Sequence, residues 1–141
     1  MNLNELTQRL IDIESVTGDE QELINFIESF LLDSGYKGNI FKDEGGLIVN
    51  IPDSNPKIAL VGHLDTVPIH ESQKNYSDEE NIYGRGAVDM KAGVAVMIQT
   101  ILDENENVVG VFYTGEEGTP EQNGLNNLMS RLKKDFSIEL A

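Results

Sequence analysis

The chain has 141 residues, which suits one domain with a hydrophobic core of its own. Hydrophobic residues make up 39% and charged residues 25%, a globular rather than a disordered composition. Acidic residues exceed basic ones by 25 to 10, and a net charge of −15 argues against a nucleic-acid partner. Cysteine is absent, which excludes disulfides, thiolate metal sites and a cysteine nucleophile. Any bound metal must therefore be held by oxygen and imidazole ligands.

Two further absences bear on location. No apolar run approaches the roughly 18 residues of a membrane span. The first residues, Met1 to Glu5, lack the basic and then apolar pattern of a secretory signal. We therefore predict a cytoplasmic protein that binds neither membranes nor nucleic acids.

The predicted elements begin with two helices. Apolar residues at helical spacing predict a helix over Leu3–Ile13. Thr17 lies three residues before Glu20, the spacing of a capping box, and a second apolar helical pattern follows. Gly35 is expected to end this second helix, because glycine readily adopts the left-handed conformation common after a helix.

Strands and helices alternate in the rest of the chain. The polar, aperiodic stretch 69–82 is expected to be a surface loop. Apolar runs predict strands over 47–51, 58–61, 108–113 and 136–140, and helical spacing predicts helices over 92–102 and 125–132. This alternation predicts an α/β fold without an internal domain boundary. We expect a three-layer sandwich in which a mostly parallel, mixed sheet carries helices on both faces.

A first candidate cluster follows strand 58–61. His63 and Asp65 lie two residues apart, so in an extended chain their side chains point the same way. They also lie at the strand end where α/β sheets bind ligands. An aspartate beside a histidine can accept one ring N–H and leave the other nitrogen to bind a metal. The alternative is a satisfied strand-end histidine, with Asp65 capping the following turn.

A second cluster places Asp89 just before helix 92–102. A helix N-cap is the alternative role for this carboxylate. Gly84 and Gly86 also suggest a dinucleotide-binding loop, but the third glycine of that motif would fall on Asp89. A carboxylate there would repel a pyrophosphate, so nucleotide binding is disfavoured.

A third cluster, Glu116 and Glu117, follows strand 108–113 between two glycines. Glu79 and Glu80 show that such pairs also arise by chance in an acidic chain, but no strand leads into that pair. Neighbouring side chains diverge, so one carboxylate can bind a metal while the other faces a bound water. A divalent cation would offset the repulsion between the two charges.

Together, the clusters supply one imidazole and several carboxylates from successive strand ends. These ligands suit Zn²⁺, Co²⁺ or Mn²⁺. Asp89 has two carboxylate oxygens and could bridge two ions roughly 3.5–4 Å apart, the spacing of two-metal hydrolytic sites. Glu116 would then accept a proton from the activated water and pass it to a leaving amine.

The three motifs read Gly-His63-Leu-Asp65-Thr-Val-Pro, Gly-Arg-Gly-Ala-Val-Asp89-Met-Lys-Ala-Gly and Gly-Glu116-Glu117-Gly. In this order they resemble the zinc-dependent family of two-metal metallopeptidases that includes succinyl-diaminopimelate desuccinylases, acetylornithine deacetylases and aminoacylases. The resemblance covers essentially the whole chain. The segment Tyr113-Thr-Gly-Glu-Glu-Gly, followed by Asn123-Gly-Leu, is most similar to the desuccinylases.

The resemblance implies a role for each residue. His63 would bind one metal, Asp89 would bridge both, and Glu117 would bind the second. Glu116 would be the general base, and Asp65 would orient His63. The resemblance also implies two Zn²⁺ ions, with Co²⁺ as an alternative, and a cis peptide bond after Asp89.

Parts of the family pattern are missing from this chain. Family members are longer, with an inserted lid and dimerisation domain, a further acidic ligand and a C-terminal histidine. Strand 136–140 resembles the one that precedes this acidic ligand, but Glu139 is a poor substitute for it and His70 lies in the polar loop. Residues 1–141 are therefore predicted to be the N-terminal portion of a catalytic domain, with weak metal binding and no appreciable turnover alone. A homodimer is expected at full length.

The predicted function is metal-dependent hydrolysis of an N-acyl amide of an amino acid. The first candidate is N-succinyl-diaminopimelate, in lysine and diaminopimelate biosynthesis. Acetylornithine deacetylation and carboxypeptidase activity are alternatives within the family. A non-catalytic metal-binding or assembly fragment is the alternative outside it. Residues that recognise the acyl group would lie in the missing lid or across a dimer interface, so the sequence leaves the substrate open.

Overall fold

Helix α1 (Leu3–Asp12) begins the structure, a computed structural model that describes residues 1–50, 58–70, 73–103 and 108–135. The Asn2 side chain accepts the Glu5 N–H and the Glu5 carboxylate accepts the Asn2 N–H, both at 2.9 Å. This capping box satisfies two backbone donors and fixes the start of the helix. Leu6 and Leu10 are buried on its inner face, as the apolar spacing predicted.

Helix α2 (Gln21–Asp33) ends before Gly35, which has a φ of 86° as expected. The predicted capping box between Thr17 and Glu20 is wrong. Glu20 is itself the N-cap residue, and its carboxylate accepts the Gly18 N–H instead of capping the helix. The Thr17 hydroxyl donates to Asp65, because an ionised acceptor distant in sequence lies within reach and makes the stronger bond.

Four strands form the main sheet in the order β1-β2-β6-β3: β1 (Asn39–Asp43), β2 (Gly46–Asn50), β6 (Val108–Tyr113) and β3 (Ile58–His63). The sheet is mixed, as predicted, but its described part is not mostly parallel. Only β3 and β6 run parallel, whereas β1–β2 and β2–β6 are antiparallel. The sequence analysis did not predict β1, because this short strand is too polar to show an apolar run. Two strands joined by a short hairpin must be antiparallel, so β1 makes the sheet more antiparallel than predicted.

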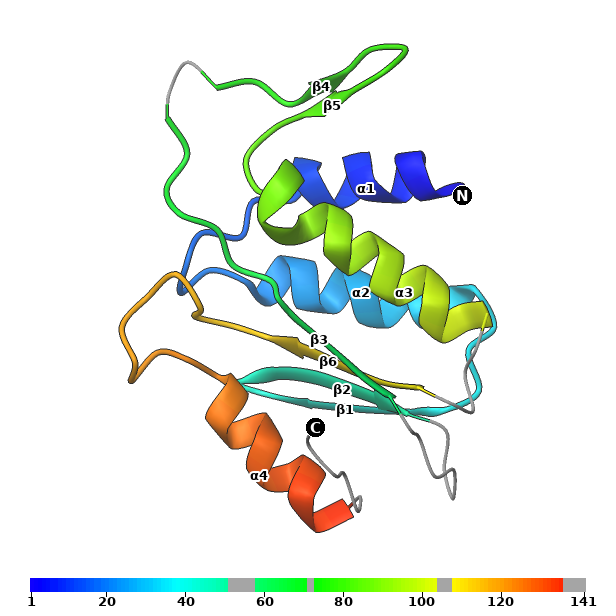
Figure 1. Ribbon diagram of the computed structural model, residues 1–141, viewed down its shortest axis with the longest axis vertical. Helices are drawn as coiled ribbons and strands as arrows, with labels where there is room; N and C mark the ends of the chain where they lie inside the picture. The colour runs from blue at the N-terminus through cyan, green and yellow to red at the C-terminus, as the bar shows by residue number, and fades with distance from the viewer. Residues whose placement is uncertain (51–57, 71–72, 104–107, 136–141) are drawn as a thin grey trace.

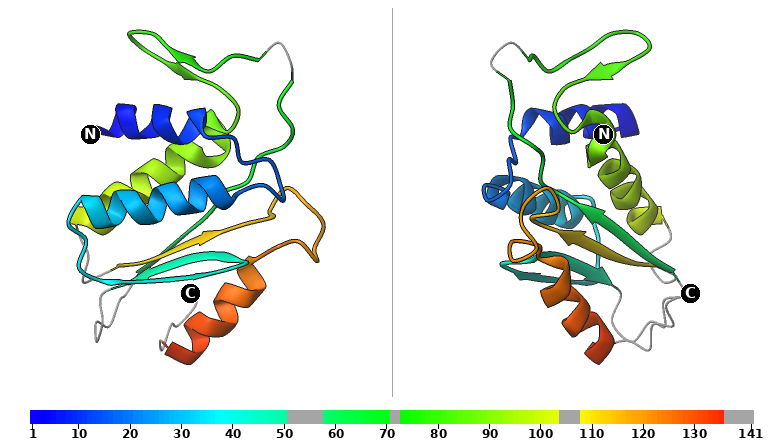
Figure 2. Two further views of the ribbon diagram at one scale, coloured as in Figure 1. Left: turned by 180° about the vertical axis from the view of Figure 1, so that it is seen from behind. Right: turned by 60° about the vertical axis from the view of Figure 1, so that its left-hand side comes forward.

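Helices cover both faces of the sheet, which confirms the three-layer arrangement. Helices α1, α2 and α3 (Ala92–Asp103) lie on one face and α4 (Leu125–Asp135) on the other (Figures 1 and 2). The larger core fills the side of the three helices and includes Leu6, Leu10, Leu23, Ile27, Ile98 and Phe112. The smaller core joins the sheet to α4 through Ile48, Val109, Val111, Leu128 and Leu132. Within the described residues, no helix is both long enough and apolar enough to span a bilayer.

The described residues of the stretch 69–82 are more ordered than predicted. They are largely exposed, as expected of a surface segment, but β4 (Tyr76–Ser77) pairs with β5 (Ile82–Tyr83) in an antiparallel hairpin. The Tyr76 and Tyr83 rings stack with their centroids 4.5 Å apart, a cross-strand pair that stabilises the hairpin. The predicted strand over 136–140 lies outside the described residues, as does Ile51 at the end of the predicted strand 47–51.

Candidate metal centre

His63 is the last residue of β3 and lies at the carboxyl end of the parallel strand pair. Its register partner is Tyr113, the last residue of β6, so the segments that follow both strands leave the sheet at one edge. The His63 side chain is buried, with 5% of the residue exposed. The Tyr113 ring and the imidazole form an edge-type ring contact with their centroids 6.1 Å apart. Sequence analysis did not single out Tyr113 as a neighbour of the site, because the pairing of β3 with β6 is tertiary.

Asp89 reaches the site from the helical turn η1 (Ala87–Lys91), which leads into α3. The peptide bond between Asp89 and Met90 is cis, as the family resemblance implied. Lys91 anchors this turn to the residue that follows α1, because its buried ammonium group donates to the Ile13 carbonyl. The Asp89 carboxylate is left 73% exposed and lies 3.0 Å from Nε2 of His63.

Glu116 and Glu117 follow β6 in a turn that begins at Gly115. Gly115 has a φ of 71°, and an added Cβ would overlap the Gln122 carbonyl, so the turn requires glycine. The Asp65 carboxylate accepts both N–H groups of the next residues, at 2.9 Å from Glu116 and 3.0 Å from Glu117. These two bonds fix the direction in which the Glu117 side chain leaves the turn.

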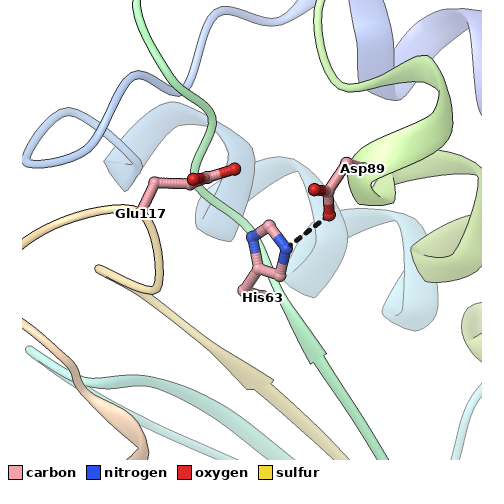
Figure 3. Close-up of side chains that lie close together, drawn as sticks. All are labelled: His63, Asp89 and Glu117. Carbon is pink, nitrogen blue, oxygen red and sulfur yellow. Dashed lines mark hydrogen bonds and ion pairs between the residues drawn. The ribbon is translucent and has the colours of Figure 1, made fainter.

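The structure brings together the three predicted metal ligands. His63, Asp89 and Glu117 each offer a ligand atom, and these atoms lie within 4.8 Å of one another. Figure 3 shows the Glu117 and Asp89 carboxylates on either side of the imidazole. One nitrogen and two carboxylate donors at this spacing fit a divalent cation such as Zn²⁺ or Co²⁺. The arrangement is thus suited to bind metal at the edge of the sheet that the sequence indicated.

Asp65 faces Nδ1 of His63 with two acceptors, the expected carboxylate and its own backbone carbonyl. Nδ1 of His63 lies 3.0 Å from the Asp65 backbone carbonyl and 3.5 Å from its carboxylate. The carbonyl is the nearer acceptor, and the carboxylate is a second, longer contact of the same nitrogen. The carboxylate also accepts hydrogen bonds from the Glu116–Glu117 turn and from the Thr17 hydroxyl. Sequence reasoning missed this use of Thr17, because its local spacing to Glu20 offered a simpler explanation.

The contact between His63 and Asp65 shifts the pKa values of both side chains. The Asp65 side chain, more than any other group, raises the pKa of His63 to about 9; burial lowers it, and Asp89 adds to the rise. Burial by itself would raise the pKa of Asp65. Hydrogen bonds from His63, two backbone N–H groups and Thr17 outweigh burial and lower that pKa to about 2. A cation that binds Nε2 must therefore displace a proton from His63.

Glu116 lies apart from the three-ligand group. Its side chain is exposed, and within the described residues it makes no hydrogen bond to another side chain. Its predicted role as general base stays a prediction. His70 is exposed, as expected, and Glu139 lies outside the described residues.

Comparison with known proteins identifies the family. The family model for Peptidase family M20/M25/M40 matches residues 59–141. The chain belongs to this family. It is 29% identical to a succinyl-diaminopimelate desuccinylase of Corynebacterium glutamicum, in an alignment that covers 96% of this chain and 39% of the relative. A succinyl-diaminopimelate desuccinylase of Wolbachia pipientis is 32% identical, over 95% of this chain and 39% of the relative.

Solved structures of M20 proteins share the fold. An M20 family metallo-carboxypeptidase from Sulfolobus solfataricus superposes with a TM-score of 0.72, at 19% identity, over 98% of this chain and 36% of that chain. A tripeptidase from Staphylococcus aureus gives a TM-score of 0.61 at 26% identity, over 82% of this chain and 36% of that chain. These matches confirm the α/β fold. The chain spans 39% of the length of the two desuccinylases above.

Proposed function

We propose that this chain forms part of a two-metal hydrolase that cleaves the amide bond of an N-acyl amino acid. The observation that carries the proposal is the convergence of His63, Asp89 and Glu117 within 4.8 Å. Membership of the M20/M25/M40 family supports hydrolysis as the reaction. The names of the desuccinylase relatives support N-succinyl-diaminopimelate as the first candidate substrate, and hence a role in lysine and diaminopimelate biosynthesis.

His63, Asp89 and Glu117 would hold the metal, with Asp89 shared between two ions. Zn²⁺ suits these imidazole and carboxylate donors, and Co²⁺ is the alternative. When bound, the ions polarise the scissile carbonyl and lower the pKa of a water molecule. The backbone carbonyl of Asp65 binds Nδ1 of His63, so that Nε2 is the nitrogen presented to the metal.

Glu116 would move the proton. Its N–H is tied to Asp65, while its side chain is exposed, and its carboxylate would accept the proton from water. In the net reaction the hydroxyl of water joins the acyl carbon, the C–N bond breaks and the leaving nitrogen takes the proton. Glu116 returns to its ionised form, and the products are a carboxylic acid and an amine.

The domain context belongs to the same proposal. We propose that residues 1–141 form the N-terminal portion of the catalytic domain, since the chain spans 39% of the length of the Corynebacterium glutamicum relative. We also propose that the complete enzyme is a cytoplasmic homodimer that acts on a small molecule. The net charge of −15 supports a function without nucleic acid.

Metal titration of histidine variants tests the centre. Isothermal titration with Zn²⁺ or Co²⁺ should show binding to the 141-residue chain. His63→Ala should weaken it by more than about 100-fold, because a direct ligand is lost. His70→Ala is the matched control, since it removes the exposed histidine of the chain and should bind metal like the parent. Equal affinities of the two variants would contradict the proposed centre.

Turnover requires the rest of the domain, so it is measured in a chimera in which this chain replaces the matching segment of the Corynebacterium glutamicum desuccinylase. We expect the chimera to hydrolyse N-succinyl-diaminopimelate, and Glu116→Gln to lower kcat by about 10²–10⁴-fold with metal binding intact. Glu79→Gln, a change in the exposed hairpin, should leave kcat unchanged.

The other outcomes of this experiment discriminate between the alternatives. Preferred hydrolysis of N-acetylornithine or of a dipeptide would reassign the substrate within the family. Full turnover by Glu116→Gln would contradict its role as general base. A chimera that binds metal and hydrolyses none of these amides would favour a non-catalytic metal-binding fragment.

A further inference from the structure

The segment between α1 and α2 lies against the segment that follows β3. Ser15 accepts the Thr66 N–H at 2.8 Å through its backbone carbonyl, and Thr17 donates its N–H to the Thr66 carbonyl at 3.2 Å. The Ser15 hydroxyl donates to the Leu64 carbonyl at 2.8 Å. Three hydrogen bonds therefore hold the segment directly after β3 against residues from a much earlier part of the chain.

The Thr17 side chain adds a contact of a different kind, because it reaches a carboxylate. Its hydroxyl donates to Oδ2 of Asp65 at 2.8 Å. The Asp65 side chain is fully buried, with 0% exposed. The same Oδ2 accepts the Glu117 N–H at 3.0 Å, and Oδ1 accepts the Glu116 N–H at 2.9 Å. One buried carboxylate thus connects Thr17 to the turn that carries the predicted general base and a metal ligand.

The hydroxyl also limits how the carboxylate can turn. An ionised carboxylate without access to bulk water depends on the donors around it, and loss of any one of them carries a cost in free energy. Within the described residues, the Thr17 hydroxyl donates to the Asp65 carboxylate alongside the backbone N–H groups of Glu116 and Glu117. Without it, rotation of the carboxylate toward another donor would loosen the bonds to the two glutamate N–H groups.

We propose that Thr17 is a positioning residue of the metal centre: its hydroxyl holds the Asp65 carboxylate in the orientation that fixes the Glu116–Glu117 turn beside His63. The inference rests on the proposed metal centre and extends it to the segment before α2. It assigns Thr17 no contact with metal or substrate. The effect of its hydroxyl is transmitted through Asp65.

Three threonine variants of the 141-residue chain test the proposal. Thr17→Val removes the hydroxyl and keeps the shape, and Thr17→Ser restores a hydroxyl. Thr7→Val is the matched control, because the buried Thr7 hydroxyl also makes a 2.8 Å hydrogen bond, to the Leu3 carbonyl within α1. Each variant is characterised by Co²⁺ affinity and by amide hydrogen exchange at Glu116 and Glu117 in the metal-free protein. Unfolding by urea gives its stability.

We expect Thr17→Val to bind Co²⁺ about 10–100-fold more weakly, the range for loss of a residue that supports a metal ligand. The Glu116 and Glu117 amides should exchange about tenfold faster, because their acceptor is no longer held. Thr17→Ser should stay within about threefold of the parent in Co²⁺ affinity, because the hydroxyl is restored. Thr7→Val should lose stability while Co²⁺ affinity and both amides stay unchanged.

Two results would overturn the proposal. One is parental Co²⁺ affinity and parental amide exchange in Thr17→Val. The other is an equal loss in Thr17→Val and Thr7→Val, which would indicate general destabilisation. Thr17→Ala, which places no second methyl beside the carboxylate, provides the same comparison if Thr17→Val does not fold. If the parent chain binds no Co²⁺, the proposed function fails, and amide exchange still decides whether Thr17 positions the turn.

Discussion

A buried, ionised carboxylate needs donors around it, and Asp65 obtains them from distant parts of the chain. The Glu116 and Glu117 N–H groups and the Thr17 hydroxyl all donate to it. Its side chain, as a hydrogen-bond acceptor, is in turn the largest cause that raises the pKa of His63 to about 9. Asp65 therefore sets the protonation state of His63 before a cation binds.

The raised pKa of His63 predicts how metal affinity depends on pH. Between pH 6 and 7.5 the imidazole is protonated, because its pKa is about 9, and a metal at Nε2 must displace that proton. Apparent affinity for Co²⁺ should therefore rise about tenfold per pH unit. Lys91 stays mostly charged in this window, since burial lowers its pKa to about 8.

Titration calorimetry in buffers of different ionisation enthalpy measures the proton released by the parent chain. Release of about one proton per bound metal at pH 7 is expected. The imidazole signal of His63 in EDTA gives its pKa directly by NMR. An affinity that does not change between pH 6 and 7.5 would show that His63 is already neutral.

At the scale of elements, the turns at the strand ends decide where the site residues project. The hairpin between β1 and β2 closes at Gly46, whose φ is 126°. Strand β2 pairs there with the end of β6, the strand that leads to the two glutamates. Thr114 donates its N–H to the Gly45 carbonyl, so the hairpin also supports the start of the glutamate turn.

Gly46→Ala should destabilise the protein by about 2–4 kcal/mol. An added Cβ would overlap the Phe112 carbonyl of β6, in addition to the cost of a positive φ. Gly35→Ala is the matched control, because its φ is 86° and a Cβ there would meet no atom within 4 Å. It should cost only about 1 kcal/mol. Urea unfolding followed by circular dichroism measures both variants, and equal losses would rule out the overlap as the cause.

At the scale of the whole molecule, acidic residues outnumber basic ones by 25 to 10. The resulting net charge of −15 opposes compaction through self-repulsion, and the metal centre adds carboxylates of the same sign at one edge of the sheet. A bound cation would relieve part of this repulsion at the site itself. Monovalent salt would relieve it over the whole surface by screening.

Thermal unfolding in EDTA should therefore depend on salt. Raising NaCl from about 10 to 150 mM shortens the Debye length from about 30 to 8 Å and should stabilise the fold by on the order of 1 kcal/mol. KCl should act like NaCl, because screening depends on ionic strength. A transition temperature that falls with salt would show that attractive ion pairs, rather than excess negative charge, dominate.

Much of this protein follows from the sequence alone. Helices α1, α2, α3 and α4 and the strands β2, β3 and β6 correspond to apolar patterns, since burial of one face imposes a period on the residues that form it. The residues His63, Asp89 and Glu117 were predicted as one group because each follows or precedes a buried element at the same sheet edge.

Tertiary structure decided the features that depend on distant partners. The polar strand β1 forms because β2 is its neighbour, and the resulting hairpin makes the described sheet more antiparallel than predicted. Thr17 serves Asp65 and not α2, because folding brings an ionised acceptor within 2.8 Å of its hydroxyl. Local spacing specifies which groups a residue offers, but only the packed chain determines which partner lies close enough to accept them.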